Sequence, residues 1–402
     1  MRNKFFIGLS IIASLLISCG EDDTADIVIT DNSSTTINNN SGGGSTDNTV
    51  LLSGIQANDL ILESDKSYII NGAVVMQEGT KIVIPAGMTI KANKGTNVYL
   101  AISQGAQIIA EGTASQPIVF TSNATVPNPG DWGGLIILGK APINSAKVTE
   151  GNFATSEIGA LSYGGTDAED NSGTIKYVRV EYSGSKISSE SENNSFSFYG
   201  VGNGTTVEFV QAFEGSDDGF EFFGGTVSAK NISAINLEDD SIDWTEGYSG
   251  NLSDVYIKQN SNSDKAFECD GYNPSIGNVS NPMFFSKPTI SNITIDGLGS
   301  GATKPDVALH LREATQGIFE NLVITGYSTA FLISGDTADS STGQTIIDDL
   351  LQINNVKFND VITKLGTKDY SGPTITDTDL FTEDANATGT DYQTWGAGWT
   401  KE

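Results

Sequence analysis

The segment Asp217-Asp-Gly-Phe-Glu-Phe-Phe-Gly-Gly225 decides the fold of this chain, because its pattern is written three times. It returns as Asp239-Asp-Ser-Ile-Asp-Trp-Thr-Glu-Gly247 and as Asp264-Lys-Ala-Phe-Glu-Cys-Asp-Gly271. In each copy apolar and acidic residues alternate, which is typical of a β-strand whose successive side chains point to opposite faces. The predicted inward residues are Phe220, Ile242 and Phe267, and the predicted outward residues are Glu221, Asp243 and Glu268.

The spacing of the copies indicates a solenoid. The inward residues of the three copies lie 22 and 25 positions apart, within the range of about 20 to 50 residues that marks solenoids and propellers. The pattern extends to Phe196-Ser-Phe198, Leu309-His-Leu311 and Phe331-Leu-Ile333. A second set of strands keeps the same step: Tyr177–Val180, Phe209–Ala212, Asn231–Ile235, Asp254–Ile257, Asn292–Ile295, Asn321–Ile324 and Asn355–Phe358.

Two sets of strands in step predict an all-β fold, a right-handed parallel β-helix over residues 50–402. A propeller would need four antiparallel strands in each blade. The step from Val255 to Ile293 is 38 residues, so we expect an inserted loop near 272–287. A helical period is suggested only near 345–351. Trp395 and Trp399 stand near the end of the chain, where we expect a C-terminal cap over the open end of the solenoid.

The N-terminus predicts an exported lipoprotein. Arg2 and Lys4 precede the apolar run 5–17, which is too short for a stable membrane span and predicts a signal peptide over 1–18. The signal ends in Leu16-Ile-Ser-Cys19-Gly20, which resembles the bacterial lipobox, and this resemblance implies lipidation of Cys19 by acyl chains such as palmitate. Residues 19–49 are rich in acids, Ser, Asn and Gly, and we expect a flexible tether there.

The net charge of the chain limits the kinds of partner that it can bind. Lys and Arg number 21 against 50 Asp and Glu, so the formal net charge is −29. Such a chain repels nucleic acid and suits a divalent-cation binder. The simpler alternative is that the acids only keep a surface solenoid soluble. Of the two cysteines, Cys269 alternates inward and is expected to be a buried thiol.

The chain resembles a family of Bacteroidota surface lipoproteins with right-handed β-helices and no established activity. The resemblance covers nearly all of the mature chain and rests on Gly130-Asp-Trp-Gly-Gly-Leu-Ile-Ile-Leu-Gly139, on the Asp217 segment and on Trp395-Gly-Ala-Gly-Trp399-Thr400. Gly20-Glu-Asp-Asp23 also resembles the export signal of lipoproteins carried to the outer face of the outer membrane. Together these imply a lipid-anchored protein of the outer membrane that faces the cell exterior.

A narrower resemblance concerns calcium. The acidic segments are similar to the Asp-Asp-x-x-Asp element of a β-helical pectate lyase family, which implies calcium ligands at Asp239, Asp240 and Asp243, with Asp217 or Asp218 from the preceding turn. That family uses a lysine base. Lys265 is the nearby lysine, but its distance in sequence from the aspartates does not clearly match that of the lysine base in this family. Lys265 would equally well neutralise the neighbouring acidic residues.

The acidic column itself calls for a cation. This column consists of the outward residues Glu221, Asp243 and Glu268. Neighbouring turns of a parallel sheet lie about 4.8 Å apart, so these carboxylates would repel one another. Calcium would screen them stoichiometrically, whereas water and salt suffice for exposed groups. The candidate metal ligands are Asp217, Asp218, Glu221, Asp239, Asp240 and Asp243.

Other residues suggest a ligand surface. Tyr248, Tyr256 and Tyr272 lie near the acidic segments and could line a groove for a glycan, although core packing explains most aromatic residues equally well. The only histidine, His310, is expected in the outward column and exposed to solvent, because the glycine-flanked histidine of a polygalacturonase is missing.

Three functions remain open on this reading. The first is a lipid-anchored, non-catalytic β-helix that binds a glycan or another extracellular ligand and is stabilised by calcium. The second is a calcium-dependent uronate lyase with Lys265 as base. The third is an accessory lipoprotein docked to an outer-membrane protein partner.

Overall fold

The computed structural model describes residues 48–147, 149, 151–187, 192–334 and 342–402. From residue 48 onward, the described residues belong to one compact unit. The predicted signal peptide, Cys19 and the tether up to residue 47 lie outside the described residues. Within the described ranges, no helix is long and apolar enough to cross a membrane.

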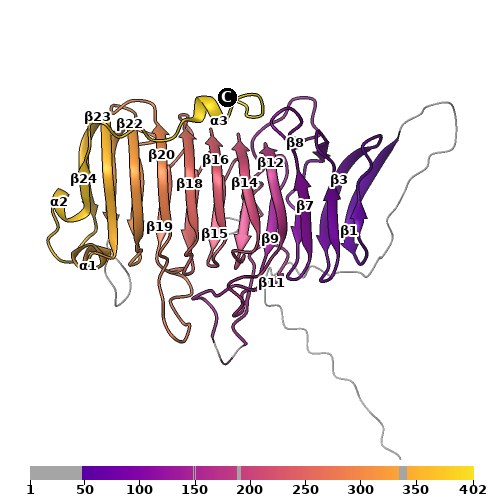
Figure 1. Cartoon of the computed structure of the whole chain (residues 1–402), viewed down its shortest axis with the longest axis horizontal. Helices are drawn as coiled ribbons and strands as arrows, with labels where there is room; N and C mark the ends of the chain where they lie inside the picture. Colours follow the sequence, from indigo (N-terminus) through magenta and orange to yellow (C-terminus); the bar gives the residue numbers. More distant parts are fainter. Residues whose placement is uncertain (1–47, 148, 150, 188–191, 335–341) are drawn as a thin grey trace, which may run out of the picture. The chain divides into compact units, whose positions relative to one another are not determined.

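The described chain is a parallel β-helix, as the repeat spacing predicts. One sheet of 22 strands contains every strand except a small antiparallel pair, and its inter-strand pairings are parallel (Figure 1). The first turns contain β1 (Thr49–Gln56), β2 (Leu60–Ile61), β3 (Ser67–Met76), β4 (Lys81–Ile84), β5 (Thr89–Ala92), β6 (Leu100–Ile102), β7 (Gln107–Glu111), β8 (Ile118–Ser122) and β9 (Leu135–Leu138). The β-helix therefore begins at Thr49, one residue before the predicted boundary.

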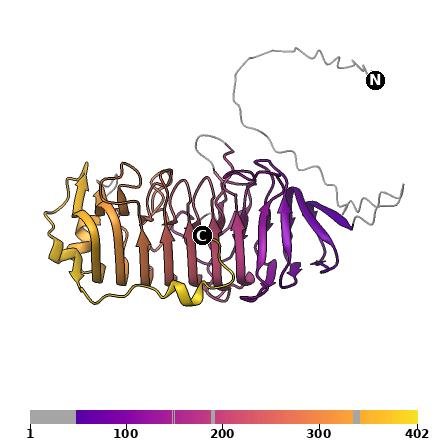
Figure 2. The same cartoon turned by 90° about the horizontal axis from the view of Figure 1, so that it is seen from above.

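Later turns alternate a long strand with a short one. The long strands are β12 (Gly173–Glu181), β14 (Thr206–Phe213), β16 (Ser228–Ile235), β18 (Asn251–Lys258), β20 (Thr289–Asp296), β22 (Gly317–Ser334) and β23 (Leu351–Lys368). The short strands are β13 (Phe196–Tyr199), β15 (Phe220–Phe223), β17 (Ile242–Thr245), β19 (Phe267–Asp270) and β21 (Val307–Arg312). Successive turns stack side by side along the unit (Figure 2).

The predicted register of the short strands is confirmed. Cα pairing joins the inward residues of successive turns in one column: Phe196, Phe220, Ile242, Phe267, Leu309 and Phe331. All six side chains are fully buried. Aromatic rings stack between turns, with centroids 4.8 Å apart for Phe196 and Phe220 and 5.1 Å apart for Phe198 and Phe222. Burial of each such ring contributes about 1.5–3 kcal/mol to stability.

Each long strand contains a bend residue at the equivalent position of its turn. These residues have φ values between 49° and 61°, the left-handed region in which Asn is better tolerated than most residues: Tyr177, Phe209, Asn231, Asp254, Asn292, Asn321 and Asn355. Three of these side chains form a hydrogen-bonded ladder, in which Asn321 donates to Asn292 over 2.9 Å and Asn292 donates to Asp254 over 3.1 Å. The recurrent Asn marks the bend between two sheet faces.

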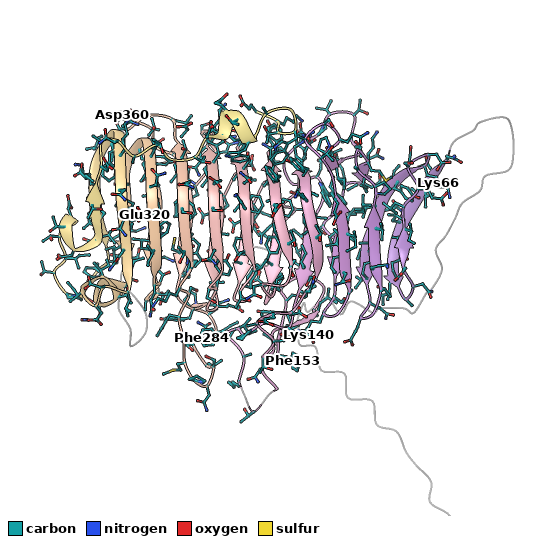
Figure 3. The ribbon with its side chains drawn as sticks, in the orientation of Figure 1. Lys66, Lys140, Phe153, Phe284, Glu320 and Asp360 are labelled. Atoms are coloured by element: carbon teal, nitrogen blue, oxygen red, sulfur yellow. The ribbon has the colours of Figure 1, made fainter. Side chains whose placement is uncertain are left out.

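Two insertions leave the β-helix on the same side (Figure 3). The segment between β19 and β20 contains no strand, which agrees with the predicted loop at 272–287 and carries Phe284. The other insertion, residues 139–172, was not predicted from the sequence. It contains the antiparallel pair β10 (Ala154–Thr155) and β11 (Ser162–Tyr163) and carries Phe153.

The C-terminus differs from the predicted cap. Helix α1 (Thr342–Ile347), helix α2 (Asp377–Leu380) and β24 (Phe381–Glu383) lie at the last turns, where Leu380 and Phe381 join the core. The following segment contains α3 (Tyr392–Trp395) and runs back along the outside of the β-helix (Figure 2). Trp399 packs edge-on against Tyr177 and Phe209, so the final tryptophans cover the side of the solenoid and not its end.

Candidate functional site

An acidic cleft of about 400 Å³ lies on the outward face of the short strands. Ten carboxylates line it against two basic side chains and one amide. The lining residues are Glu157, Glu192, Asn194, Asp217, Asp218, Glu221, Asp239, Asp240, Asp243, Asp264, Lys265, Glu268 and Arg312. All six predicted metal ligands and Lys265 therefore meet in one site.

Strand register determines which carboxylates form the floor of the cleft. Glu221 of β15 pairs with Asp243 of β17, and Asp243 pairs with Glu268 of β19, so one outward carboxylate from each turn stands above the next. The paired aspartates precede these strands and also hold the following turn. Asp218 accepts a hydrogen bond from the backbone N–H of Asp240 at 3.0 Å, and Asp240 accepts one from the N–H of Lys265 at 2.8 Å.

In one half of the cleft, which we call the uncompensated half, the negative charges of the carboxylates are not balanced by basic side chains of the described residues. Oxygens of Asp218, Glu221 and Asp243 lie within 4.8 Å of one another. None of these three carboxylates forms an ion pair with a basic side chain in the described part of the chain. Asn194 donates a hydrogen bond to Glu221, but the buried Oδ1 of Asp243 has no hydrogen-bond partner.

Burial and mutual repulsion shift the pKa values in this half. Burial raises the pKa of Asp218, Glu221 and Asp243 well above their ordinary values, and the neighbouring carboxylates raise them further. Burial and the charge of Glu192 raise the pKa of Asp217 to about 9. These groups resist ionising together unless a cation joins them.

The other half of the cleft is neutralised by protein cations. Glu268 lies 3.2 Å from Lys265 Nζ and 3.0 Å from Arg312 Nη2, and it also forms a hydrogen bond of 3.1 Å with His310 Nδ1. Burial alone would raise the pKa of Glu268, but the hydrogen bond with His310 and the charges of Arg312 and Lys265 lower it to about 2. Arg312 also forms two hydrogen bonds to Asp270, at 2.7 and 2.6 Å.

Lys265 is held as a cation. Its ammonium lies 2.6 Å from Asp264 and 3.8 Å from Asp240. Burial alone would lower the pKa of Lys265, but Asp240, Glu268 and Asp264 raise it well above its ordinary value. A general base needs a pKa near the working pH, so this environment favours the neutralising role of Lys265 over a role in proton abstraction.

The three tyrosines do not share a surface, which differs from the predicted groove. Tyr248 is fully buried, stacks on Phe222 and donates a hydrogen bond to a backbone carbonyl in the core. Tyr272 is 2% exposed and hydrogen-bonds Glu313. Tyr256 lies under the C-terminal segment, with its ring centroid 3.9 Å from that of Tyr392.

Some site residues were missed by sequence reasoning. Glu157 and Glu192 line the cleft, and Asn194 contacts Glu221 directly. These residues lie outside the repeated acidic pattern. Alternation along a strand predicts the direction of strand side chains only, so it could not predict that these loop side chains reach the cleft. His310 also differs from its prediction, because it is 8% exposed and hydrogen-bonds both Glu268 and Ser334.

Comparison with known proteins found a similarity to a solved structure and to a family model. No curated protein matches the chain. The structure of rice weevil pectin methyl esterase aligns with 71% of this chain and 81% of its own, at 11% sequence identity and a TM-score of 0.25. The model of the pectate-lyase-like β-helix domain matches residues 54–400. The chain therefore belongs to the family of pectate-lyase-like β-helix domains.

Proposed function

We propose that this protein binds calcium in the uncompensated half of the acidic cleft and uses the bound cation to hold an extracellular anionic ligand, such as a polysaccharide. The observation that carries the proposal is the group Asp218, Glu221 and Asp243, which has three close carboxylates, no basic partner among the described residues and one buried oxygen without a hydrogen bond.

The donor set fits calcium. Calcium takes six to eight oxygen ligands, mostly from carboxylates, carbonyls and water. Asp218, Glu221 and Asp243 would hold the ion, with Asp217 and Asp239 beside them. The third group of close carboxylates, Asp239, Asp240 and Asp264, is already neutralised in part by Lys265. This difference favours the first group as the cation site.

The uronate lyase alternative has weaker support. Elimination needs a base that takes a proton from carbon, and Lys265 is held protonated by its carboxylate neighbours. A cation in the cleft would still let carboxylates of a ligand complete its coordination shell. Calcium-mediated binding without elimination therefore agrees better with the contacts of Lys265.

The proposal includes a location. Cys19 would carry the lipid, and the acidic, Ser- and Asn-rich segment 19–49 would tether the β-helix to the outer face of the outer membrane. Docking to an outer-membrane protein partner is compatible with this tether. Release of the protein from membranes by Cys19→Ala would support the anchor, and unchanged membrane retention would overturn it.

Calorimetric titration of calcium into chelated protein that lacks residues 1–47 tests the cation site. The expected result is stoichiometric binding that is lost in the double variant Asp218→Asn/Asp243→Asn and kept in Asp306→Asn, a matched change at an exposed residue outside the cleft. Absence of binding to the wild type would refute the proposal.

A second assay separates binding from elimination. The calcium-loaded protein is mixed with polygalacturonate or alginate, and both retention of the polymer and ultraviolet absorbance of unsaturated ends are measured. Calcium-dependent retention without new absorbance is expected. Steady formation of unsaturated ends would instead establish the lyase.

A further inference from the structure

Three polar side chains next to the cleft form one hydrogen-bonded chain. His310 Nδ1 lies 3.1 Å from Glu268 Oε1, and His310 Nε2 hydrogen-bonds the hydroxyl of Ser334. Glu268 belongs to β19, His310 to β21 and Ser334 to the end of β22, so the chain crosses three successive turns. His310 is the only histidine of the protein.

Strand register holds these side chains on one face. Glu268 pairs with His310, and His310 pairs with Leu332 on the next strand. The intervening residues Leu311 and Ile333 point into the core and are fully buried. Alternation therefore directs His310 and Ser334 outward, and the hydrogen-bonded sheet fixes their separation.

The hydrogen-bond partners of His310 determine which of its two ring nitrogens carries the proton. An ionised Glu268 only accepts hydrogen bonds, so Nδ1 of a neutral His310 carries the proton. Nε2 is then the acceptor for the Ser334 hydroxyl. A nucleophile bonded to Nε2 and a carboxylate bonded to Nδ1 is the arrangement in which a histidine acts as general base for a serine.

We propose that Ser334, His310 and Glu268 form an acyl-transfer site that hydrolyses carboxylic esters, with Ser334 as nucleophile, His310 as general base and acid, and Glu268 as the positioning residue. Asp270 lies on the same strand as Glu268, and Asp243 pairs with Glu268 from the neighbouring turn, so carboxylates on the Glu268 side of the site disfavour an anionic acyl group. The expected substrate class is therefore an ester with an uncharged acyl group, such as O-acetyl. This inference does not depend on the proposed cation site.

The reaction balances with water as the only other reactant. Ser334 Oγ bonds to the acyl carbon while its proton moves to His310 Nε2. The bond from the acyl carbon to the alcohol oxygen breaks, and the alcohol leaves with that proton. Water then attacks the acyl-serine and gives a proton to His310, and the acid leaves as Ser334 regains its hydroxyl proton.

Arg312 is the candidate group for the developing oxyanion. Leu311 pairs with Ile333, so Arg312 and Ser334 are the next residues along these two paired strands. Asp270 and Glu268 engage Nε and Nη2 of Arg312, whereas Nη1 has no hydrogen bond to a residue that the structure describes. Because Asp270 and Glu268 fix this guanidinium, it can stabilise negative charge without reorganising during the reaction.

Covalent labelling of the full-length protein tests the proposal. A fluorophosphonate probe is expected to add to Ser334, as mapped by peptide mass spectrometry, and p-nitrophenyl acetate should be hydrolysed. Ser334→Ala should abolish both. His310→Gln, which keeps a hydrogen-bonding side chain without the base, should slow labelling and hydrolysis by about a hundredfold or more.

Ser253→Ala is the matched control, since Ser253 is a half-buried outward serine on a strand of another face. It should leave labelling and hydrolysis unchanged, and thermal unfolding should confirm that all variants are folded. Failure to label Ser334 in the wild type, or equal labelling rates in the wild type and His310→Gln, would overturn the proposal. Calcium titration of the same samples reports separately on the cleft.

Discussion

Replacing Asp243 by Asn should stabilise the protein without calcium and destabilise it with calcium. Asp243 lies within 4.8 Å of Asp218 and Glu221, and its buried Oδ1 has no hydrogen-bond partner. In the metal-free protein this carboxylate is repelled by its neighbours. When calcium is bound, the same carboxylate would be a ligand. One substitution therefore changes the free energy of unfolding in opposite directions under the two conditions.

The repulsion sets the size of the effect. Two unit charges 4.8 Å apart repel by about 3.5 kcal/mol at an effective dielectric constant near 20. A third carboxylate thus meets about 7 kcal/mol from two ionised neighbours. It can instead keep a proton, which costs about 4 kcal/mol at pH 7 for a group of ordinary pKa 3.8. Protonation is the cheaper state, so the destabilisation that Asn removes is at most about 4 kcal/mol.

The sign with pH follows from the raised pKa of Asp243. The folded state binds this proton more tightly than the unfolded state does, so the metal-free wild type loses stability as pH rises above about 4. At pH 5 the same proton costs about 2 kcal/mol, so the gain from Asn should shrink to that value or less. In calcium at about ten thousand times its Kd, the wild type should gain about 5.5 kcal/mol that the variant lacks, which exceeds the maximum of about 4 kcal/mol that Asn gains without calcium.

Urea unfolding in chelator at pH 5 and pH 7, and in excess calcium at pH 7, measures these differences. Asp306→Asn removes an exposed carboxylate outside the cleft and serves as the control. If Asp243→Asn gains nothing in chelator, or gains equally at both pH values, the carboxylates do not repel one another as described.

Three further changes test other contacts. Lys265→Met should destabilise the protein by about 3–5 kcal/mol in urea unfolding, because it leaves the buried Asp240 and the half-buried Asp264 and Glu268 without their shared cation. A loss below about 1 kcal/mol would mean that Arg312 suffices. Trp399→Ala should cost about 3–5 kcal/mol, since the ring is 1% exposed and packs on two turns, and an unchanged melting temperature would contradict the role of the C-terminal segment. Asn292→Ala should cost about 2 kcal/mol in the same unfolding assay, through its left-handed backbone and lost ladder bonds; the control Asn386→Ala, an exposed loop residue, should cost much less.

Strand alternation and repeat spacing were enough to predict the β-helix and its register. The inward column at Phe220, Ile242 and Phe267 follows from a side-chain period of two along each strand and a step of one turn between strands. The outward acids of the same strands had to form a column for the same reason. Calcium binding, lipidation at Cys19 and the outer-membrane location stay predictions from the sequence.

The sequence by itself thus determined the solenoid, the acidic column and the insertion before β20, because each depends on local periodicity. Tertiary structure decided which carboxylates form ion pairs with basic side chains. Lys265 and Arg312 reach Glu268 and leave Asp218, Glu221 and Asp243 uncompensated. It also joined Ser334 to His310, buried the tyrosines and turned the C-terminal segment back along the helix. These contacts join side chains on different turns, so their outcome depends on how long side chains and loops pack in three dimensions and not on residue spacing.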